Sequence, residues 1–442
     1  MPFDEILARI QGMLTGILGA PAEKIRPDAR LLKDLGADSW QYLEFRTEIE
    51  RVFGVVVPDT AVNRLGTPKQ AAGLVAELLD AGRPAARVAE AAPAPAHADR
   101  GADARLLADG RYAVDLEVGL PLMGRNNLGE TPLLKVLGAM RWDHMRRLTG
   151  VPSRRLTDES GERLLPTFYY VKIRFPRERP LAFYGENDRI TVVNTLQSYG
   201  GAILDGFSFL YPADWAAERK TAFLTGEQAE AAGVPYVRTS NIFVKRVEGA
   251  GKLRNARPVQ KEMANLPQAA DVPSTYALLR KATEEGRFVA PPPHSTRLTP
   301  ERGTVRYEID PDRDLNALGL LYFANYPAIL DTAERSVLSK APVLPIPADL
   351  LDARTVVYRE IAYLANAHAS DPIDVHVDAW IENPFLGDHP TPTLAPVRLL
   401  LNYEMRRLSD GEKMLVSTAE KVVTGRTLLD SGLLDRLRDL AR

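Results

Sequence analysis

Ser39 is the residue whose surroundings most directly indicate a chemical role. It follows Leu35-Gly36-Ala37-Asp38 and precedes a segment in which Leu43, Ile49 and Phe53 recur at helical spacing, so a helix is predicted to begin here. A helix start offers unpaired N–H groups and a partial positive charge, which suit a phosphodiester on the serine hydroxyl. Serine is also a common helix N-cap, so the residue types alone leave a modified and a structural serine open.

A second pattern with possible chemistry, Asn-x-Leu-Gly, occurs twice. It runs from Asn126 to Gly129 and again from Asn316 to Gly319. Apolar helix candidates follow, near 130–149 and near 319–339, and each half has one predicted strand before the pattern and several after its helix. The matching order of elements favours an internal duplication over chance recurrence.

The segments that must position these residues differ in composition. Residues 1–82 are predicted to be a small all-α domain with three apolar-periodic helices, and residues 83–105, rich in Ala and Pro, an extended tether. Residues 106–295 and 296–442 each combine β-branched strands with one long helix, which predicts two α+β domains. The expected strands include 112–120, 167–175, 189–197, 206–210, 237–247, 304–309, 355–365, 373–381, 397–408 and 414–423.

Bulk composition narrows the function classes. The 442 residues carry a net charge of −2, which gives no electrostatic case for nucleic acid. There is no Cys, which excludes disulfides, a thiol nucleophile and a cysteine metal site. No metal site is expected from the scattered His residues. No apolar run reaches membrane-span length and no signal peptide is recognisable, so we expect a cytoplasmic protein that does not bind membranes.

The first domain resembles acyl and peptidyl carrier proteins over about 80 residues. The resemblance is carried by Leu31-Leu32-Lys33-Asp34-Leu35-Gly36-Ala37-Asp38-Ser39 and by Phe53-Gly54-Val55-Val56-Val57-Pro58-Asp59. It implies a small all-α four-helix carrier domain with a 4′-phosphopantetheine arm attached covalently to Ser39 by a phosphopantetheinyl transferase. Trp40 departs from the Leu or Met usual in the family, a change that bears on partner docking and leaves the hydroxyl in place.

The second half resembles hotdog-fold acyl-thioester enzymes, in which an antiparallel sheet wraps a long helix. The similar segment runs from Asn316 through Tyr322, Phe323 and Asp331 to Glu334. The resemblance implies that N–H groups at the helix start polarise a thioester carbonyl, with Gly129 and Gly319 as candidate positions. Each glycine is also compatible with a tight turn.

The hotdog pattern is broken at one informative position. Hydrolytic members have a carboxylate where this chain has Asn316, and Asn126 stands at the equivalent place in the first half. An amide cannot act as a base at neutral pH, although Asp314 and Glu130 lie nearby as possible substitutes. A neutral amide would instead tolerate and stabilise an enolate that a carboxylate would repel.

The tandem arrangement is similar to the leinamycin-type acyltransferase/decarboxylases, which are double hotdogs. That resemblance implies a tyrosine acyl acceptor, for which Tyr169 and Tyr170 are the candidates, on a strand where neighbours alternate faces. A tyrosine nucleophile needs its pKa lowered from near 10; Lys172 and Arg174 lie on the side of Tyr170. Core aromatics and a solvated strand face are the alternatives for these four residues.

Together the resemblances imply a function. We expect transfer of an acyl group from malonyl- or methylmalonyl-CoA to the chain's own carrier arm, with decarboxylation, followed by delivery to a downstream polyketide-type synthase. The chain could be a monomer, because a tandem pair can form within one chain, or a homodimer. A thioesterase, a dehydratase and a non-catalytic acyl-binding module remain as alternatives.

Overall fold

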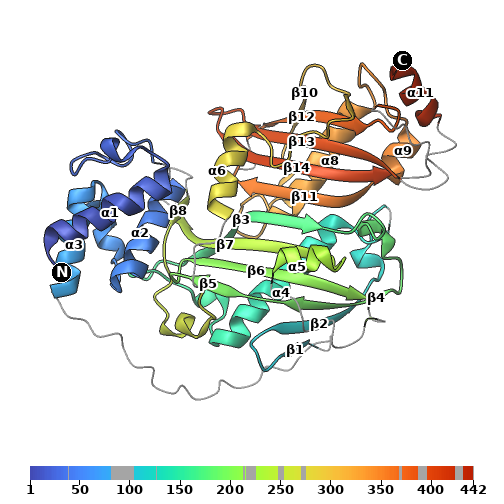
Figure 1. The fold of residues 1–442 in the computed structure, drawn as a ribbon. Helices are drawn as coiled ribbons and strands as arrows, with labels where there is room; N and C mark the ends of the chain where they lie inside the picture. Colours follow the sequence, from blue (N-terminus) through green and yellow to red (C-terminus); the bar gives the residue numbers. More distant parts are fainter. Residues whose placement is uncertain are drawn as a thin grey trace.

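The computed structural model describes residues 1–37, 39–80, 104–125, 127–212, 215, 225–246, 253–269, 275–367, 371–386, 396–423 and 432–441. They form a small helical domain and a larger antiparallel sheet domain (Figure 1). Asn126, one of the candidate residues, lies outside the described part, as does most of the Ala/Pro-rich segment.

Three α-helices build the N-terminal domain: α1 (Phe3–Leu18), α2 (Ser39–Phe53) and α3 (Pro68–Asp80), with a 3₁₀ helix at Asp59–Leu65. Apolar residues at helical spacing face inward, including Ile6, Ile10 and Leu14 of α1. They pack against Phe45 and Ile49 of α2, all fully buried. The three predicted helices are therefore confirmed, and α2 begins at Ser39 as the sequence indicated.

The sheet domain is one antiparallel sheet whose two halves follow the two halves of the sequence. In spatial order the main path is β1 (Ala104–Leu106), β2 (Tyr112–Glu117), β4 (Arg189–Asn194), β6 (Ile203–Pro212), β7 (Tyr236–Arg246), β3 (Leu165–Arg174), β11 (Thr355–Tyr363), β14 (Lys413–Val423), β13 (Val397–Arg407), β12 (Ile373–Glu382) and β10 (Gly303–Tyr307). Three short strands lie off this path: β5 (Gln197–Tyr199), β8 (Leu253–Asn255) and β9 (Ser295–Arg297).

The halves meet where β3 pairs with β11, Tyr170 to Arg174 lying opposite Ala362 to Tyr358. Two long helices, α4 (Glu130–Thr149) and α8 (Tyr326–Leu338), share one apolar core with the inner residues of both halves. On β3, Val171 and Ile173 belong to that core, whereas Tyr170 belongs to a separate cluster with α6 (Thr275–Glu285). The shared core makes the sheet domain one structural body.

The remaining helices are short: α5 (Gly226–Ala231), α7 (Pro311–Asp314), α9 (Ala348–Ala353) and α11 (Leu433–Leu440). The N-terminal domain lies against the first half of the sheet domain, with α2 on the side of β8 (Figure 1). Within the described ranges, no helix combines the length and the apolar character needed to cross a membrane.

Candidate functional site

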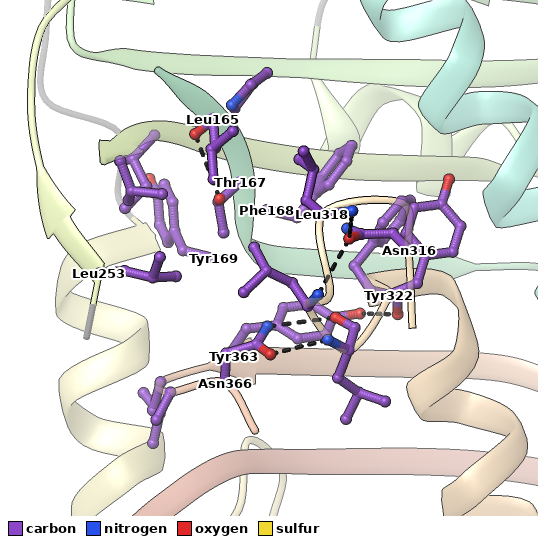
Figure 2. A pocket seen from close by; sticks show the side chains of 18 of the residues that line it. Leu165, Thr167, Phe168, Tyr169, Leu253, Asn316, Leu318, Tyr322, Tyr363 and Asn366 are labelled. Carbon is purple, nitrogen blue, oxygen red and sulfur yellow. Dashed lines mark hydrogen bonds between the residues drawn. The ribbon is translucent and has the colours of Figure 1, made fainter. Parts of the chain in front are cut away.

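A cavity of about 730 Å³ opens between the two halves of the sheet domain. Its walls come from β3, β7 and β8 of the first half and from the second half's segment 316–326, the end of β11 and the β13–β14 hairpin (Figure 2). The lining includes Phe168, Tyr169, Leu253, Asn255, Asn316, Leu318, Leu320, Leu321, Tyr322, Asn366, Asp371, Arg407, Asp410 and Glu412. Apolar side chains and neutral polar groups make up most of this lining, and five charged residues join them: Arg163, Asp371, Arg407, Asp410 and Glu412.

Asn316 lines this cavity and is held in place by its own loop. Its Oδ1 accepts hydrogen bonds from the backbone N–H groups of Leu318, at 2.9 Å, and Leu320, at 3.2 Å (Figure 2). Because the oxygen of the amide is engaged, its Nδ2 group is the end that remains as a donor. Asn316 is half-buried and lines the cavity.

Gly319 occupies a turn rather than a helix start. Its φ is +67°, a conformation that favours glycine, and its N–H donates to the Asn316 carbonyl at 2.8 Å. The helix α8 begins only at Tyr326, so the expectation of a helix near 319 is wrong by about two turns. With its N–H already donated, Gly319 shapes the loop and is not an oxyanion donor in this geometry.

Gly129 does lie at a helix start, as the N-cap residue of α4. Its N–H, however, donates to the Leu122 carbonyl at 2.9 Å. A Cβ at this position would approach the Gly124 nitrogen and Pro132 to 2.8 Å. Close packing therefore explains this glycine, and its N–H is also engaged within the backbone.

A network of ion pairs joins Glu130 of the first half to four residues of the second half. Glu130, which follows Gly129, lies 2.6 Å from Arg359, and Arg359 also pairs with Asp331 at 2.7 Å. Lys421 bridges Asp331 and Glu334 at 2.7 and 2.6 Å. Arg359 and Glu334 are completely buried, and Lys421 and Glu130 are nearly so, whereas the Asp331 side chain is 37% exposed. In the repeat, the position of Glu130 corresponds to Leu320, which lines the cavity.

The cations of this buried cluster favour the charged form of the Glu334 carboxylate. Burial alone would raise the pKa of Glu334, but Lys421 and then Arg354 outweigh it and hold the pKa below its usual value. For Glu130 burial wins over Arg359, and its pKa is raised. Neither residue is among those lining the cavity, so Glu130 is not placed as a base for a substrate there.

Tyr169 and Tyr170 are separated by a β-bulge. The pairing of β3 with β7 shifts between Phe168 and Tyr170, so the simple alternation expected from the sequence fails here. Tyr169 lines the cavity, with its Oη 3.0 Å from Thr275 Oγ1. The Tyr170 hydroxyl donates to Glu360 instead, and Tyr170 is not a lining residue.

Both tyrosines are poor nucleophiles in this environment. Burial, and then the charge of Asp205, raises the pKa of Tyr169 above its usual value, and burial together with Glu360 raises that of Tyr170. Lys172 and Arg174, the cations expected to lower it, pair instead with Glu230 at 3.4 and 3.5 Å. Tyr169 is thus a neutral phenol at the cavity wall, suited to donating or accepting a hydrogen bond.

Asn366 is a site residue that the sequence did not single out. It follows β11, and its Oδ1 accepts from the Leu321 N–H at 2.9 Å while its Nδ2 donates to the Leu321 carbonyl at 3.3 Å (Figure 2). These two bonds fix the loop that carries Asn316. No local sequence signal indicates such a role, because the partners are 45 residues apart.

Three carboxylates line the cavity in and near the β13–β14 hairpin: Asp371, Asp410 and Glu412. Arg407 donates to Asp410 at 2.6 Å and also pairs with Glu412. The hydrogen bond from Arg407 holds the pKa of Asp410 at about 2, which makes it a weak base. Asp314, considered as a substitute base, instead accepts from Tyr307 at 2.7 Å and does not line the cavity.

Ser39 is the first residue of the 15-residue helix α2 of the N-terminal domain. Gly36, three residues earlier, has a φ of +68°, which lets the chain turn sharply into the helix. A hydroxyl residue opening a helix provides both an attachment oxygen and the favourable end of the helix dipole for a phosphate. The residues present therefore fit a phosphopantetheine group.

Comparisons with known proteins support this fit. Residues 8–75 match the family described as the phosphopantetheine attachment site. The acyl carrier protein of Zymomonas mobilis is 38% identical over 69 residues, which cover 16% of this chain and 88% of that protein. The acyl carrier protein of Rubrobacter xylanophilus is 34% identical over 77 residues, covering 17% of this chain and 95% of its own length.

The sheet domain has weaker likenesses among solved structures. An acyl-ACP thioesterase from Bacteroides thetaiotaomicron is 11% identical, with coverage of 71% of this chain and 98% of that chain and a TM-score of 0.42. The 12:0-ACP thioesterase from Umbellularia californica is 9% identical, with coverage of 71% and 94% and a TM-score of 0.41. Scores this low assign neither substrate nor chemistry. The N-terminal domain of this chain, in contrast, belongs to the acyl carrier protein family and carries 4′-phosphopantetheine.

Proposed function

We propose that the sheet domain is a double hotdog that loads the chain's own carrier domain. It would take a malonyl or methylmalonyl group from coenzyme A, transfer it to the arm on Ser39 and release CO₂. The domains would be 1–82 (carrier), 83–105 (tether), 106–295 and 296–442 (hotdog units). The observation that carries the proposal is the cavity between the halves, which has the neutral amide of Asn316 where a hydrolase would need a base.

The reaction balances without a further co-reactant. When attached, phosphopantetheine supplies the thiol that accepts the acyl group: one C–S bond forms, the C–S bond to coenzyme A breaks, and the thiol proton passes to coenzyme A. Decarboxylation, before or after transfer, breaks the C–C bond to the substrate carboxylate. The electron pair left on the carbon forms an enolate, and a proton from water yields an acetyl or propionyl thioester.

The chain's own residues would stabilise charge and exclude water. Nδ2 of Asn316, held by the two N–H groups that bind its Oδ1, would donate to the enolate oxygen. Tyr169 would serve as a neutral hydrogen-bonding group rather than as an acyl acceptor, because burial raises its pKa. Asn126 is the counterpart of Asn316 in the sequence repeat, and we propose the same role for it. Gly129 and Gly319 would keep the two loops in shape.

Fusion of the carrier adds a kinetic advantage. A tethered partner has an effective local concentration on the order of millimolar, so transfer within the chain would outcompete free carriers at ordinary protein concentrations. The loaded arm would then serve a downstream polyketide-type condensing enzyme.

Intact-protein mass spectrometry tests the proposal. The protein is first treated with a phosphopantetheinyl transferase and coenzyme A, and then with malonyl-CoA or methylmalonyl-CoA. We expect a phosphopantetheine gain that is absent in Ser39→Ala, followed by an acetyl or propionyl gain. Persistence of the intact malonyl group on the arm would exclude decarboxylation.

Thioester hydrolysis is the second candidate, because Asp371, Asp410 and Glu412 line the cavity. A carboxylate there could activate water, although Arg407 holds Asp410 as a weak base. Release of free acid with the arm left unloaded would favour hydrolysis over transfer.

A further inference from the structure

The carrier domain contacts the sheet domain through the C-terminal half of α2. Glu48 accepts a hydrogen bond from the Tyr199 hydroxyl at 2.9 Å, and Glu50 forms an ion pair with Arg257, whose Nη1 lies 2.9 Å from Oε1. Arg280 of α6 donates to the Ile17 carbonyl, at the end of α1, at 3.1 Å. Acidic side chains of the carrier thus meet a tyrosine and arginines of the sheet domain.

The two surfaces are closely packed at Thr47 and Gly200. Thr47 is 1% exposed. A Cβ added to Gly200 would overlap the Thr47 methyl group and lie 3.5 Å from the Thr47 Cβ. Only a residue without a side chain allows this approach, which indicates a fitted contact rather than a loose one.

The short strand β8 joins this contact to the cavity. Leu253 and Asn255 line the cavity, whereas Arg254, between them, is exposed. Burial raises the pKa of Tyr42 of α2, and the charge of Arg254 acts against this rise, which places Arg254 on the side of the carrier. This is the alternation of faces expected along a strand. Arg257, two residues after the end of β8, forms the ion pair with Glu50. One strand therefore forms a wall of the cavity and, on its other side, part of the carrier contact.

We propose that Tyr199, Gly200, Arg257 and Arg280 form a docking site that holds the chain's own carrier at the cavity. The occupant is fixed by charge and fit: Glu48 and Glu50 match Tyr199 and Arg257, and Thr47 fills the space above Gly200. While docked, the carrier keeps these acidic residues of α2 covered, so a second protein can bind that face only after the carrier leaves. The role of the site in loading rests on the acyl transfer proposed above, but the docking itself does not.

A disulfide trap tests the docking directly. The chain has no native Cys, so in protein that has not yet been treated with the phosphopantetheinyl transferase, and therefore lacks the thiol of the arm, Thr47→Cys combined with Gly200→Cys introduces the only two thiols. The 3.5 Å between the two Cβ positions lies within the range of about 3.5–4.5 Å found in disulfides. We expect rapid, intramolecular disulfide formation in mild oxidant, measured as loss of titratable thiols and of two hydrogens by mass.

Thr47→Cys combined with Gly201→Cys is the matched control. Gly200 and Gly201 have φ values of +55° and +67°, so both substitutions strain the backbone alike. A Cβ on Gly201 has Arg257, and no atom of Thr47, within 4 Å. Equal oxidation rates in the two variants, or no disulfide in the Gly200 variant, would overturn the proposed site.

A charge reversal provides a test that does not alter a glycine. Arg257→Glu is expected to slow loading of the arm at least tenfold. Arg306 lies on β10, at the end of the sheet that belongs to the second half, and forms an exposed ion pair with Asp374, so Arg306→Glu is expected to leave the loading rate unchanged. If the Thr47/Gly200 cysteine pair forms its disulfide but neither the wild type nor any variant loads its arm, the docking site is retained and acyl transfer is refuted. If the wild type loads its arm, Arg257→Glu loads at the same rate, and the Thr47/Gly200 cysteine pair forms no disulfide, acyl transfer is retained and the docking site is refuted.

Discussion

Replacing Asn316 by Asp separates the contribution of this residue to the reaction from its contribution to the stability of the protein. Asn316 Oδ1 accepts from Leu318 and Leu320 at 2.9 and 3.2 Å, and a carboxylate oxygen would accept the same two bonds. Asn316→Asp is therefore expected to fold normally. Asn316→Leu removes the single oxygen that accepts both hydrogen bonds; at about 1 kcal/mol for each bond, the variant is expected to lose about 2 kcal/mol of stability.

The effect of Asp on the reaction is expected to be larger than its effect on folding. At an effective dielectric constant of about 20, two negative charges about 6 Å apart repel by about 3 kcal/mol. If the substrate carboxylate and the enolate are bound near Asn316, this repulsion slows decarboxylative loading by roughly 100-fold. The neutral amide is thus expected to be worth two orders of magnitude in rate while contributing little more than Asp to stability.

The assay compares the initial rate of arm loading, followed by intact mass, with thermal unfolding of the same proteins. Asn316→Asp with a normal unfolding temperature and a loading rate within threefold of the wild type would refute the placement of the reaction at this loop. A gain of free acid in Asn316→Asp would instead show that the amide suppresses hydrolysis.

Three further results are expected. Lys421→Met leaves Glu334 with one cation fewer in the core and should lower the free energy of unfolding by about 3–5 kcal/mol in denaturant titrations. Burial lowers the pKa of His144 to about 4 from 6.5, so the unfolded chain takes up the proton first, and stability should fall as the pH drops from 6.5 towards 4. In His144→Gln, the melting temperature should decrease less over this pH range than it does in the wild type. Tyr169→Phe removes the hydrogen bond to Thr275 and should retain arm loading within about tenfold, whereas an acyl-tyrosine mechanism requires complete loss of loading by mass.

The sequence predicted those features that depend on local patterns. The helices of the carrier follow from apolar spacing around residues such as Ile10 and Ile49, and the start of α2 at Ser39 from the preceding turn. The start of α4 after Gly129 was likewise correct. The same pattern failed at Gly319, because the residues around it close a hairpin-like turn through the Asn316–Leu320 backbone bonds before α8 begins.

The parts that could not be predicted depend on distant partners. Alternation along β3 was expected to separate Tyr169 from Tyr170, but a bulge decides which one reaches the cavity, and bulges leave little trace in one strand's sequence. Asn366 joins the site only because β11 ends beside the Asn316 loop. The pair of Glu50 and Arg257 spans 207 residues.

Two corresponding positions of the sequence repeat have different roles: Leu320 lines the cavity, whereas Glu130 forms an ion pair with Arg359. This difference bears on the ratio of arms to cavities. A symmetric pair of identical subunits would have to repeat every change at both of its sites. A chain that contains both halves can change one of them without changing the other. Ser39 lies in the same chain as the cavity, so in the proposed reaction every arm is made together with a cavity, and the ratio of the two does not depend on the concentration of the protein.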